Sequence, residues 1–260
     1  WPLPSMAPLA HTLALLAMTV ATTAVKVVPL DMAQDSFDDQ YQGCGPAMTA
    51  ELPALNRSEL QQSGHFAKAW ALAAAEWRVR TSPGSPLSPA QAIALLAYTA
   101  PVPLHQTFNA AVRAAGRSHQ EYRDNFHFKT LHFLLTQALA QLRGTQGQQC
   151  HDVFRGVHNC QFQAQRGQKV RFGQFASTSP SITTALSFGM DTVFQVHTCH
   201  GVAIREFSRY RGEKETFEVT NATGDGKRAR IWLRSTGTHS TYNCEWLRGD
   251  VTEGTTWGDG

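Results

Sequence analysis

The sequence predicts an α+β domain, with helices in the first half of the chain and strands in the second. Residues 45–145 carry apolar side chains at three- and four-residue steps, a spacing typical of helices. Residues 150–250 contain short runs of β-branched and aromatic residues, which are typical of strands. The polar segment 144–149 separates the two patterns, so we expect a helical part packed on a mixed β-sheet core.

The first helices are indicated by their apolar faces and start signals. An Ala-rich stretch from His65 to Arg78 places Trp70 and Trp77 on one face, which we expect to contact the core. The string Ser88-Pro89-Ala90-Gln91 predicts a capped helix start with proline in the first turn. A helix through residues 93–97 should follow.

Two further helices have predicted ends at glycines. A helix from Leu104 to Ala115 should stop at Gly116, since glycine tolerates the left-handed conformation that often follows a helix. A wide apolar stripe predicts a helix from Phe128 to Leu142, with Gly144 just beyond its end. This stripe should pack against the strand-rich half.

Five strands are predicted from the second half. They are the runs Val153 to Val157, Val170 to Phe175, Thr192 to Thr198, Val202 to Phe207 and Arg230 to Arg234.

Composition and charge exclude some classes of partner. The 260 residues carry a formal net charge of +3, and the cations are spread along the chain. We therefore do not expect nucleic acid as the main partner. A diphosphate ligand remains compatible with this charge, because it needs only one or two well-placed cations.

The N-terminus has the pattern of an export signal. Residues 13–28 are mostly apolar or small, and Thr22-Thr23-Ala24 suits cleavage, so we interpret residues 1–25 as a leader and residues 26–260 as one domain. The alternative is a buried N-terminal helix. The run is short and broken by threonine, so no membrane span is expected.

Export would make disulfides and glycans the expected modifications. The five cysteines contain no Cys-x-x-Cys motif that would indicate zinc; they are Cys44, Cys150, Cys160, Cys199 and Cys244. Two sequons, at Asn56 and Asn221, are predicted glycosylation sites of a secreted glycoprotein. The string His197 to His200 resembles a metal cluster, but its side chains would alternate between the faces of a strand, so we expect no metal.

Three segments of the second half carry residues suited to chemistry. Glu213 and Glu215 lie two apart, so an extended backbone would point both carboxylates to one side, where they suit glycosidic bond cleavage. The alternative is a solvated charged turn. Arg155 lies in an apolar strand and needs an anionic partner, either a ligand or an internal carboxylate. Gly156 allows a close backbone approach or marks a bulge. No Gly-x-Ser-x-Gly motif supports a serine nucleophile.

These segments occur in a characteristic order: Val153 to Val157, Phe175 to Ser179 and Gly212 to Glu215. Together with Asp35 to Tyr41 and Tyr242 to Cys244, they resemble the vertebrate arginine-specific mono-ADP-ribosyltransferases. The resemblance covers nearly the whole chain after the leader. It implies a fold with a cleft for NAD, and a secreted, extracellular enzyme that uses NAD as co-substrate, with no permanently bound cofactor.

The resemblance also implies roles for single residues. Glu215 would stabilise the oxocarbenium-like ribose, and Glu213 would orient the acceptor, which is an arginine-containing protein or a small guanidine. Ser177 would fix the rotamer of the catalytic glutamate, and Arg155 and Gly156 would bind NAD. Phe188 would stack on nicotinamide, with core packing as its alternative. The implied disulfides are Cys44 with Cys244 and Cys150 with Cys199, which leaves Cys160 unassigned.

The sequence departs from the family pattern directly after Glu215. The family has an apolar strand ending in two prolines there, whereas this chain continues with residues 216–219, as if about seven residues were lost. Those four residues alternate polar and apolar, so they could replace the strand by a shift of register. Water could compete as the acceptor, so an NAD glycohydrolase is one alternative to arginine transfer. The departure adds a second alternative, a secreted NAD-binding or interaction protein without activity.

Overall fold

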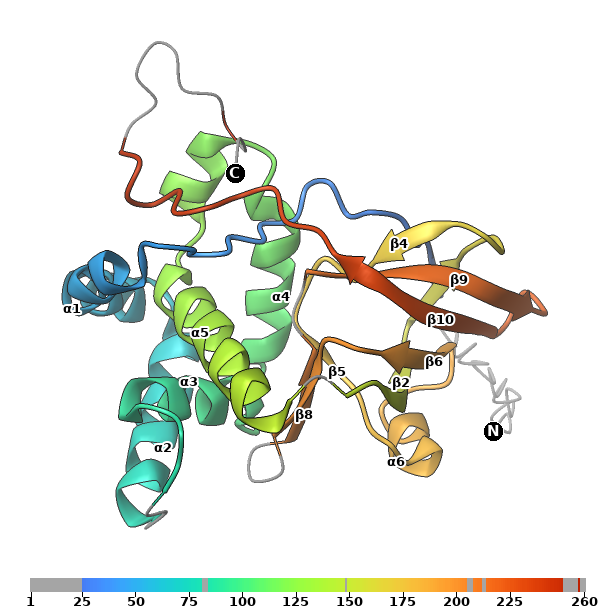
Figure 1. The fold of residues 1–260 in the computed structure, drawn as a ribbon, viewed down its shortest axis with the longest axis horizontal. Coiled ribbons are helices and arrows are strands. Elements are labelled where there is room, and N and C mark those ends of the chain that lie inside the picture. Colours follow the sequence, from blue (N-terminus) through green and yellow to red (C-terminus); the bar gives the residue numbers. More distant parts are fainter. Residues whose placement is uncertain are drawn as a thin grey trace, which may run out of the picture.

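The computed structural model describes residues 25–80, 84–147, 149–204, 208–211, 214–249 and 257. Most helices lie on one side of the molecule and most strands on the other (Figure 1). The predicted α+β class is confirmed. Within the described part, no helix has the length and apolar character needed to cross a bilayer. Residues 1–24 of the predicted leader lie outside the described residues, but residues 26–29 form a strand rather than a buried helix.

The helical part contains α1 (Gly45–Gln62), α2 (Gly64–Val79), α3 (Pro89–Thr99), α4 (Leu104–Ala115), a π-helical turn (Glu121–Asn125) and α5 (Lys129–Gln146). The predicted cap of α3 is present: Ser88 Oγ accepts from Gln91 N, and the Gln91 side chain accepts from Ser88 N. Trp70 and Trp77 pack against the core only partly buried. The helix α1, which contains Pro53, lies within the predicted helical range 45–145, but the sequence analysis did not give it separate bounds.

The two glycines predicted to follow helices have other roles. Gly116 follows α4 with φ −80°, so it is not left-handed. A Cβ at this position would lie 2.7 Å from the Ser36 carbonyl oxygen, so glycine allows close backbone packing instead. Gly144 lies inside α5, which continues to Gln146, and Gly147 adopts the positive φ of 76° after the helix. The helix predicted from Leu104 to Ala115 is therefore confirmed with those bounds and with Gly116 directly after it, but the left-handed conformation expected for Gly116 was wrong. The predicted position of Gly144 beyond a helix end was also wrong.

The strands form three sheets. The five-stranded sheet has the order β2 (His151–Val157), β6 (Thr192–Thr198), β10 (Ala229–Thr238), β9 (Glu215–Gly224) and β4 (Lys169–Arg171). A three-stranded sheet has the order β5 (Ala176–Ser177), β8 (Ser208–Arg211) and β7 (Gly201–Ile204), and β1 (Lys26–Pro29) pairs with β3 (Cys160–Gln163). A short helix, α6 (Ile182–Leu186), packs near β2.

The predicted strands correspond to β2, β4, β6, β7 and β10, and β6 has the predicted bounds. The run 170–175 was too long, since β4 ends at Arg171. The residues directly after Glu215 form strand β9, in which polar Thr216 is buried along with its apolar neighbours. In β9, Phe217 and Val219 are buried in the core of the five-stranded sheet, whereas Glu218 is exposed.

Two chain segments far apart in sequence join the halves. The segments before α1 and after β10 run together between helices and strands (Figure 1), and Gln40 N donates to the Tyr242 carbonyl oxygen. Asp38 is fully buried, pairs with Arg171 and accepts from the backbone N of Thr241. These buried charges were not predicted to have a structural role.

Candidate active site

Arg155 and Ser177 meet where the five-stranded sheet faces the three-stranded sheet. Arg155 lies in the middle of β2 and its Nη1 donates to the Ser177 carbonyl oxygen at 2.9 Å. Its guanidinium carbon lies 5.9 Å from the ring centroid of Phe172. We call Arg155, Ser177 and Phe172 the Arg155 junction. It brings two of the three predicted catalytic segments together.

The helical part supports this junction. Tyr98 Oη on α3 and Asn109 Nδ2 on α4 both donate to the Phe175 carbonyl oxygen at 3.1 Å. Arg113 on α4 donates to the Gln174 side chain. Because residues 174–175 lead directly into β5, these contacts fix the position of Ser177.

His105 in the first turn of α4 also belongs to this region. Burial lowers the pKa of His105, and the positive charge of Arg155 lowers it further. Both causes favour the neutral form of the imidazole beside the Arg155 guanidinium. No periodic pattern or motif in the sequence pointed to His105, because its proximity to Arg155 arises from helix packing.

Gly156 is required for close packing of α6 against β2. A Cβ at Gly156 would overlap the carbonyl oxygens of Ala185 and Gly189. Phe154 exchanges two backbone hydrogen bonds with Ser179, so its N–H and C=O point to the edge of β2 that faces away from β6. The direction of these groups repeats every two residues along a strand, so the N–H and C=O of Gly156 point to the same edge. Glycine here thus has a packing reason in addition to any contact with a ligand.

Phe188 follows α6 and is 69% exposed. Its ring is therefore not part of the core, which excludes the alternative of core packing. An exposed phenyl group close to Gly156 and Gly189 has the chemistry to stack on a planar ligand.

Glu215 lies in a different environment, at the start of β9. It is 2% exposed, and its Oε2 accepts from Thr198 Oγ1 at 2.5 Å. Its Oε1 accepts from Cys199 N at 2.9 Å and from His200 N at 3.1 Å. We call these four residues the Glu215 anchor. The carboxylate ties the β6–β7 turn to β9.

The Glu215 anchor and the Arg155 junction occupy different positions along β6. Arg155 pairs with Phe194, whereas the carboxylate of Glu215 is bonded to Thr198, four residues further along. Four residues of strand span about 13 Å. Glu213, the other predicted carboxylate, lies outside the described residues.

Both disulfides implied by the family resemblance are formed. Cys44 is bonded to Cys244, and Cys150 to Cys199 in the turn of the Glu215 anchor. Cys160 is free and partly buried, and burial raises the pKa of its thiol.

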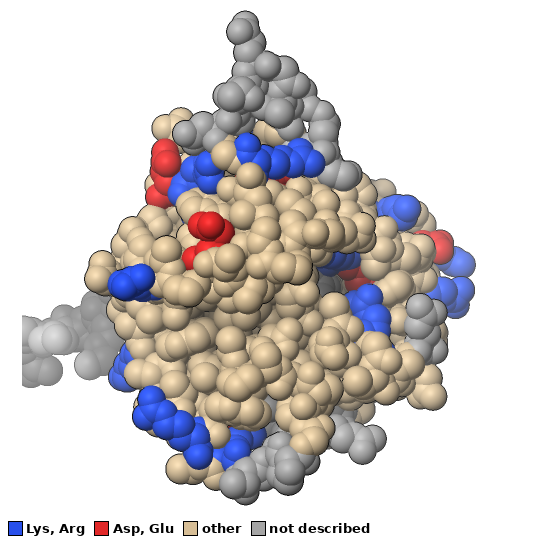
Figure 2. Space-filling view, turned by 60° about the vertical axis from the view of Figure 1, so that its left-hand side comes forward, with Lys and Arg blue, Asp and Glu red and all other residues tan. Residues whose placement is uncertain are grey.

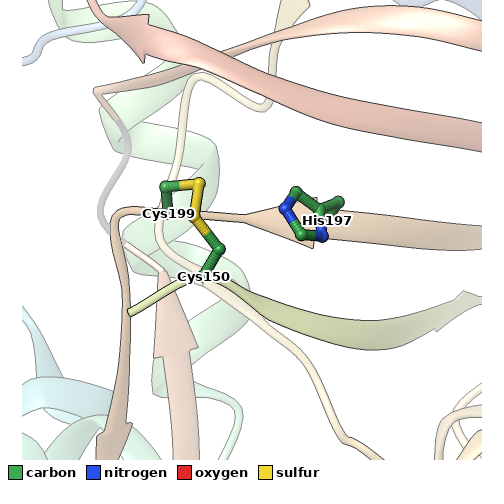
Figure 3. Close-up of side chains that lie close together, drawn as sticks. All are labelled: Cys150, His197 and Cys199. Carbon is green, nitrogen blue, oxygen red and sulfur yellow. A yellow bond between two sulfur atoms is a disulfide. The ribbon is translucent and has the colours of Figure 1, made fainter. Parts of the chain in front are cut away.

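His197 lies beside the disulfide of the anchor (Figure 3). Ligand atoms of Cys150, His197 and Cys199 come within 4.8 Å of one another. The disulfide leaves no thiolate to bind a metal, and His197 Nδ1 contacts Asp152 Oδ1 at 2.9 Å. The cluster is therefore not a metal site while the disulfide is intact.

A groove of about 830 Å³ lies away from these residues. It is lined by β1, β3 and the end of the β9–β10 hairpin, and neither Arg155 nor Ser177 contributes to it. On the face shown in Figure 2, the Lys and Arg side chains form several separate groups rather than one continuous patch. The geometry therefore places the candidate site at the Arg155 junction.

The chain was compared with known proteins. Residues 30–241 match the model of the NAD:arginine ADP-ribosyltransferase family. The chain is 50% identical over 244 residues to NAD(P)(+)-arginine ADP-ribosyltransferase 2 of Gallus gallus, covering 90% of this chain and 77% of that protein. It is 48% identical over 246 residues to the human GPI-linked NAD(P)(+)-arginine ADP-ribosyltransferase 1, covering 85% and 75%.

Solved structures agree with the sequence matches. The crystal structure of the eukaryotic mono-ADP-ribosyltransferase ART2.2 superposes with a TM-score of 0.70 at 32% identity, covering 84% of this chain and 98% of that one. A variant of ART2.2 in complex with NAD gives a TM-score of 0.69. The matches confirm the predicted fold, enzyme class and NAD as co-substrate. The chain belongs to the NAD:arginine ADP-ribosyltransferase family.

Proposed function

We propose that this protein transfers ADP-ribose from NAD to arginine side chains of proteins or to small guanidines, and releases nicotinamide. The observation that carries the proposal is the contact between Arg155 and Ser177, because it joins two family segments from separate sheets at one place. The half-buried guanidinium presents parallel donors suited to a diphosphate.

The reaction breaks the bond between ribose C1 and the nicotinamide nitrogen. The electron pair leaves with nicotinamide, which becomes neutral, while positive charge develops on C1 and the ring oxygen. A nearby carboxylate stabilises that charge. An acceptor guanidinium loses a proton to a base, and its nitrogen then forms the new bond to C1. Phe188 and the backbone of Gly156 would hold the nicotinamide end.

This mechanism requires one carboxylate that faces the ribose, and its identity has to be tested. The family resemblance assigns it to Glu215, with Glu213 as the residue that orients the acceptor. The three hydrogen bonds of Glu215 favour a structural role for it in the described state. For Glu215 to act on ribose, the anchor would have to release it.

Charge-removing variants test the assignment. The wild type, Glu213→Gln and Glu215→Gln are incubated with labelled NAD and a small guanidine, and nicotinamide, free ADP-ribose and modified guanidine are quantified. Loss of all nicotinamide release in Glu215→Gln, measured at a temperature at which the variant is still fully folded, supports its catalytic role. Retained release contradicts it. A shift of product from modified guanidine to free ADP-ribose in Glu213→Gln supports its acceptor role.

The second candidate is NAD binding without turnover. It is favoured by one observation, namely that both oxygens of Glu215 are occupied in the anchor. Calorimetric titration with NAD that gives binding, together with no nicotinamide release over hours, would establish this function. Turnover of the wild type excludes it.

The protein is further proposed to act outside the cell as a secreted protein. Two disulfides form from distant cysteines, which fits an oxidising compartment. Measuring the protein in the medium and on the surface of expressing cells distinguishes secretion from anchoring.

A further inference from the structure

The two sequons lie in different structural settings. Asn56 lies within α1, and its Oδ1 is buried and has no hydrogen-bond partner among the described residues. Asn221 lies on β9 with its side chain exposed. A glycan on Asn221 can extend directly into solvent, whereas a glycan on Asn56 would have to displace the amide from its position.

Asn221 lies directly opposite an aromatic side chain. In the antiparallel pairing of β9 with β10, Asn221 is the partner of Trp232. Partners in such a pair project from the same face, with Cβ atoms about 5 Å apart. The neighbouring Ala222 packs on the opposite face, against the core of the five-stranded sheet. The Asn221 amide and the indole therefore share the outer face of the sheet.

The indole of Trp232 is held in place. Its Nε1 donates to Gln195 Oε1 on β6 at 3.0 Å, and the side chain is half-buried. Arg230 and Arg234 are exposed on the same strand, two residues to either side. An aromatic plane flanked by hydrogen-bond donors suits a sugar, whose C–H groups pack on the ring while its hydroxyls accept hydrogen bonds.

We propose that Asn221 carries an N-linked glycan whose first N-acetylglucosamine packs on Trp232, and that Asn56 remains unmodified. The inference rests on the export part of the proposed function and is independent of catalysis. It assigns Trp232 and Gln195 a role that the candidate active site does not use.

The modification forms one bond and breaks another. The Asn221 Nδ2 forms a bond to C1 of the first sugar of an oligosaccharide carried on a lipid diphosphate. The bond from C1 to the diphosphate oxygen breaks, and the lipid diphosphate leaves with the electron pair. One proton of the amide passes to a base of the transferase in the secretory pathway. Thr223 supplies the hydroxyl of the sequon.

Site occupancy is measured on residues 1–260 expressed in animal cells behind a secretion signal, so that failure of the native leader does not affect the test. Peptide mass spectrometry after enzymatic deglycosylation in heavy-oxygen water locates each modified asparagine. We expect the label at Asn221 and none at Asn56. An unmodified Asn221 in the secreted protein, or a modified Asn56, overturns the inference.

Packing on Trp232 is measured by thermal unfolding. Thr223→Val removes the sequon at nearly constant shape, and Thr223→Ser retains it as the matched control. We expect Thr223→Val to lower the Tm by about 2–4 °C, and Thr223→Ser to leave it unchanged. Trimming the glycan to a single N-acetylglucosamine should also leave the Tm unchanged, because the first sugar makes the contact.

The coupling to Trp232 comes from a double-mutant cycle. In a Trp232→Ala background, Thr223→Val should have no effect on Tm beyond error. An equal loss of Tm in both backgrounds shows that the glycan stabilises without contacting the indole, and contradicts the proposal. If Trp232→Ala does not fold, Trp232→Leu replaces it, since leucine keeps apolar area but lacks the ring plane.

Discussion

The Arg155 junction and the Glu215 anchor both contain a predicted catalytic residue, but their surroundings differ. Arg155 is half-buried, lies near the exposed Phe188 and is joined to Ser177 by one hydrogen bond. Glu215 is buried on β9 and accepts three hydrogen bonds from the β6–β7 turn, which is held by a disulfide at Cys199. The comparison indicates that the Arg155 side chain is less enclosed than that of Glu215, whose carboxylate holds the β6–β7 turn to β9.

The largest expected effect is on the disulfide of the anchor. The double variant Cys150→Ala with Cys199→Ala removes a bond across 49 residues. The chain-entropy model gives a loss of up to about 4 kcal/mol in the free energy of unfolding. Urea denaturation measures it, and Cys160→Ser is the matched control, with little expected change. NAD affinity should stay within about threefold if the two regions are independent; a larger fall would show that the anchor supports the junction.

The next largest effect is on Glu215 itself. Glu215→Ala leaves one buried and two partly buried donors without their acceptor, which should lower the free energy of unfolding by about 3 kcal/mol. Glu215→Gln keeps one carbonyl oxygen and should lose about half as much. Glu218→Ala, at an exposed position on the same strand, is the control. Equal stability of the Glu215 and Glu218 variants would be incompatible with the anchor.

Arg155→Lys should weaken NAD binding about ten- to a hundredfold, because lysine lacks the two parallel donors that match a diphosphate. Calorimetry measures the Kd. The free energy of unfolding should change by less than about 1 kcal/mol, since lysine keeps the positive charge and can still donate to the Ser177 carbonyl oxygen. Arg230→Lys on the outer face of the sheet is the control. A large loss of stability with unchanged affinity would assign Arg155 to the structure instead.

Phe188→Ala tests the role of the exposed ring that follows α6. Surface substitutions change stability by about 0.5 kcal/mol or less, so the Tm should stay the same. Loss of stacking should raise the KM for NAD several-fold. Exposed Met190→Ala is the matched control. An unchanged KM for Phe188→Ala argues that the ring does not contact nicotinamide.

The smallest effect is on the titration of His105. Its pKa is lowered by burial and by Arg155, so protonation disfavours the folded state, and stability falls as the pH drops below the ordinary histidine value of 6.5. Arg155→Gln removes the second cause, so the His105 pKa measured by NMR should rise, whereas Arg155→Lys should leave it nearly unchanged. If the pKa of His105 is the same in Arg155→Gln and the wild type, the charge of Arg155 does not act on His105.

Much of the fold could be predicted because periodic patterns and caps act locally. Ser88 and Gln91 form the expected capping box, and β6 has the expected bounds. Gly116 and Gly144 show the limit of local patterns. A glycine can allow a left-handed turn, can allow another backbone to approach closely, or can simply be tolerated inside a helix. The sequence shows the same residue in all three cases, and only the packing of the neighbouring chain distinguishes them.

The candidate site was predicted in part. Segment order pointed to Arg155 and Ser177, and the structure brings them together. The surroundings of Glu215 were not foreseen, because two of its three donors are backbone N–H groups, which every residue but proline carries. His105 was missed for a similar reason, since packing of α4 alone brings it near Arg155.

The sequence by itself determined the family, the α+β class, the order of the catalytic segments and the alternation that places Phe217 and Val219 inside the sheet. Only the tertiary structure decided that the carboxylate of Glu215 is buried and which of the two sequons is open to solvent. Both depend on contacts between residues distant in the chain: the β6–β7 turn surrounds Glu215, and the pairing of β9 with β10 sets Asn221 beside Trp232.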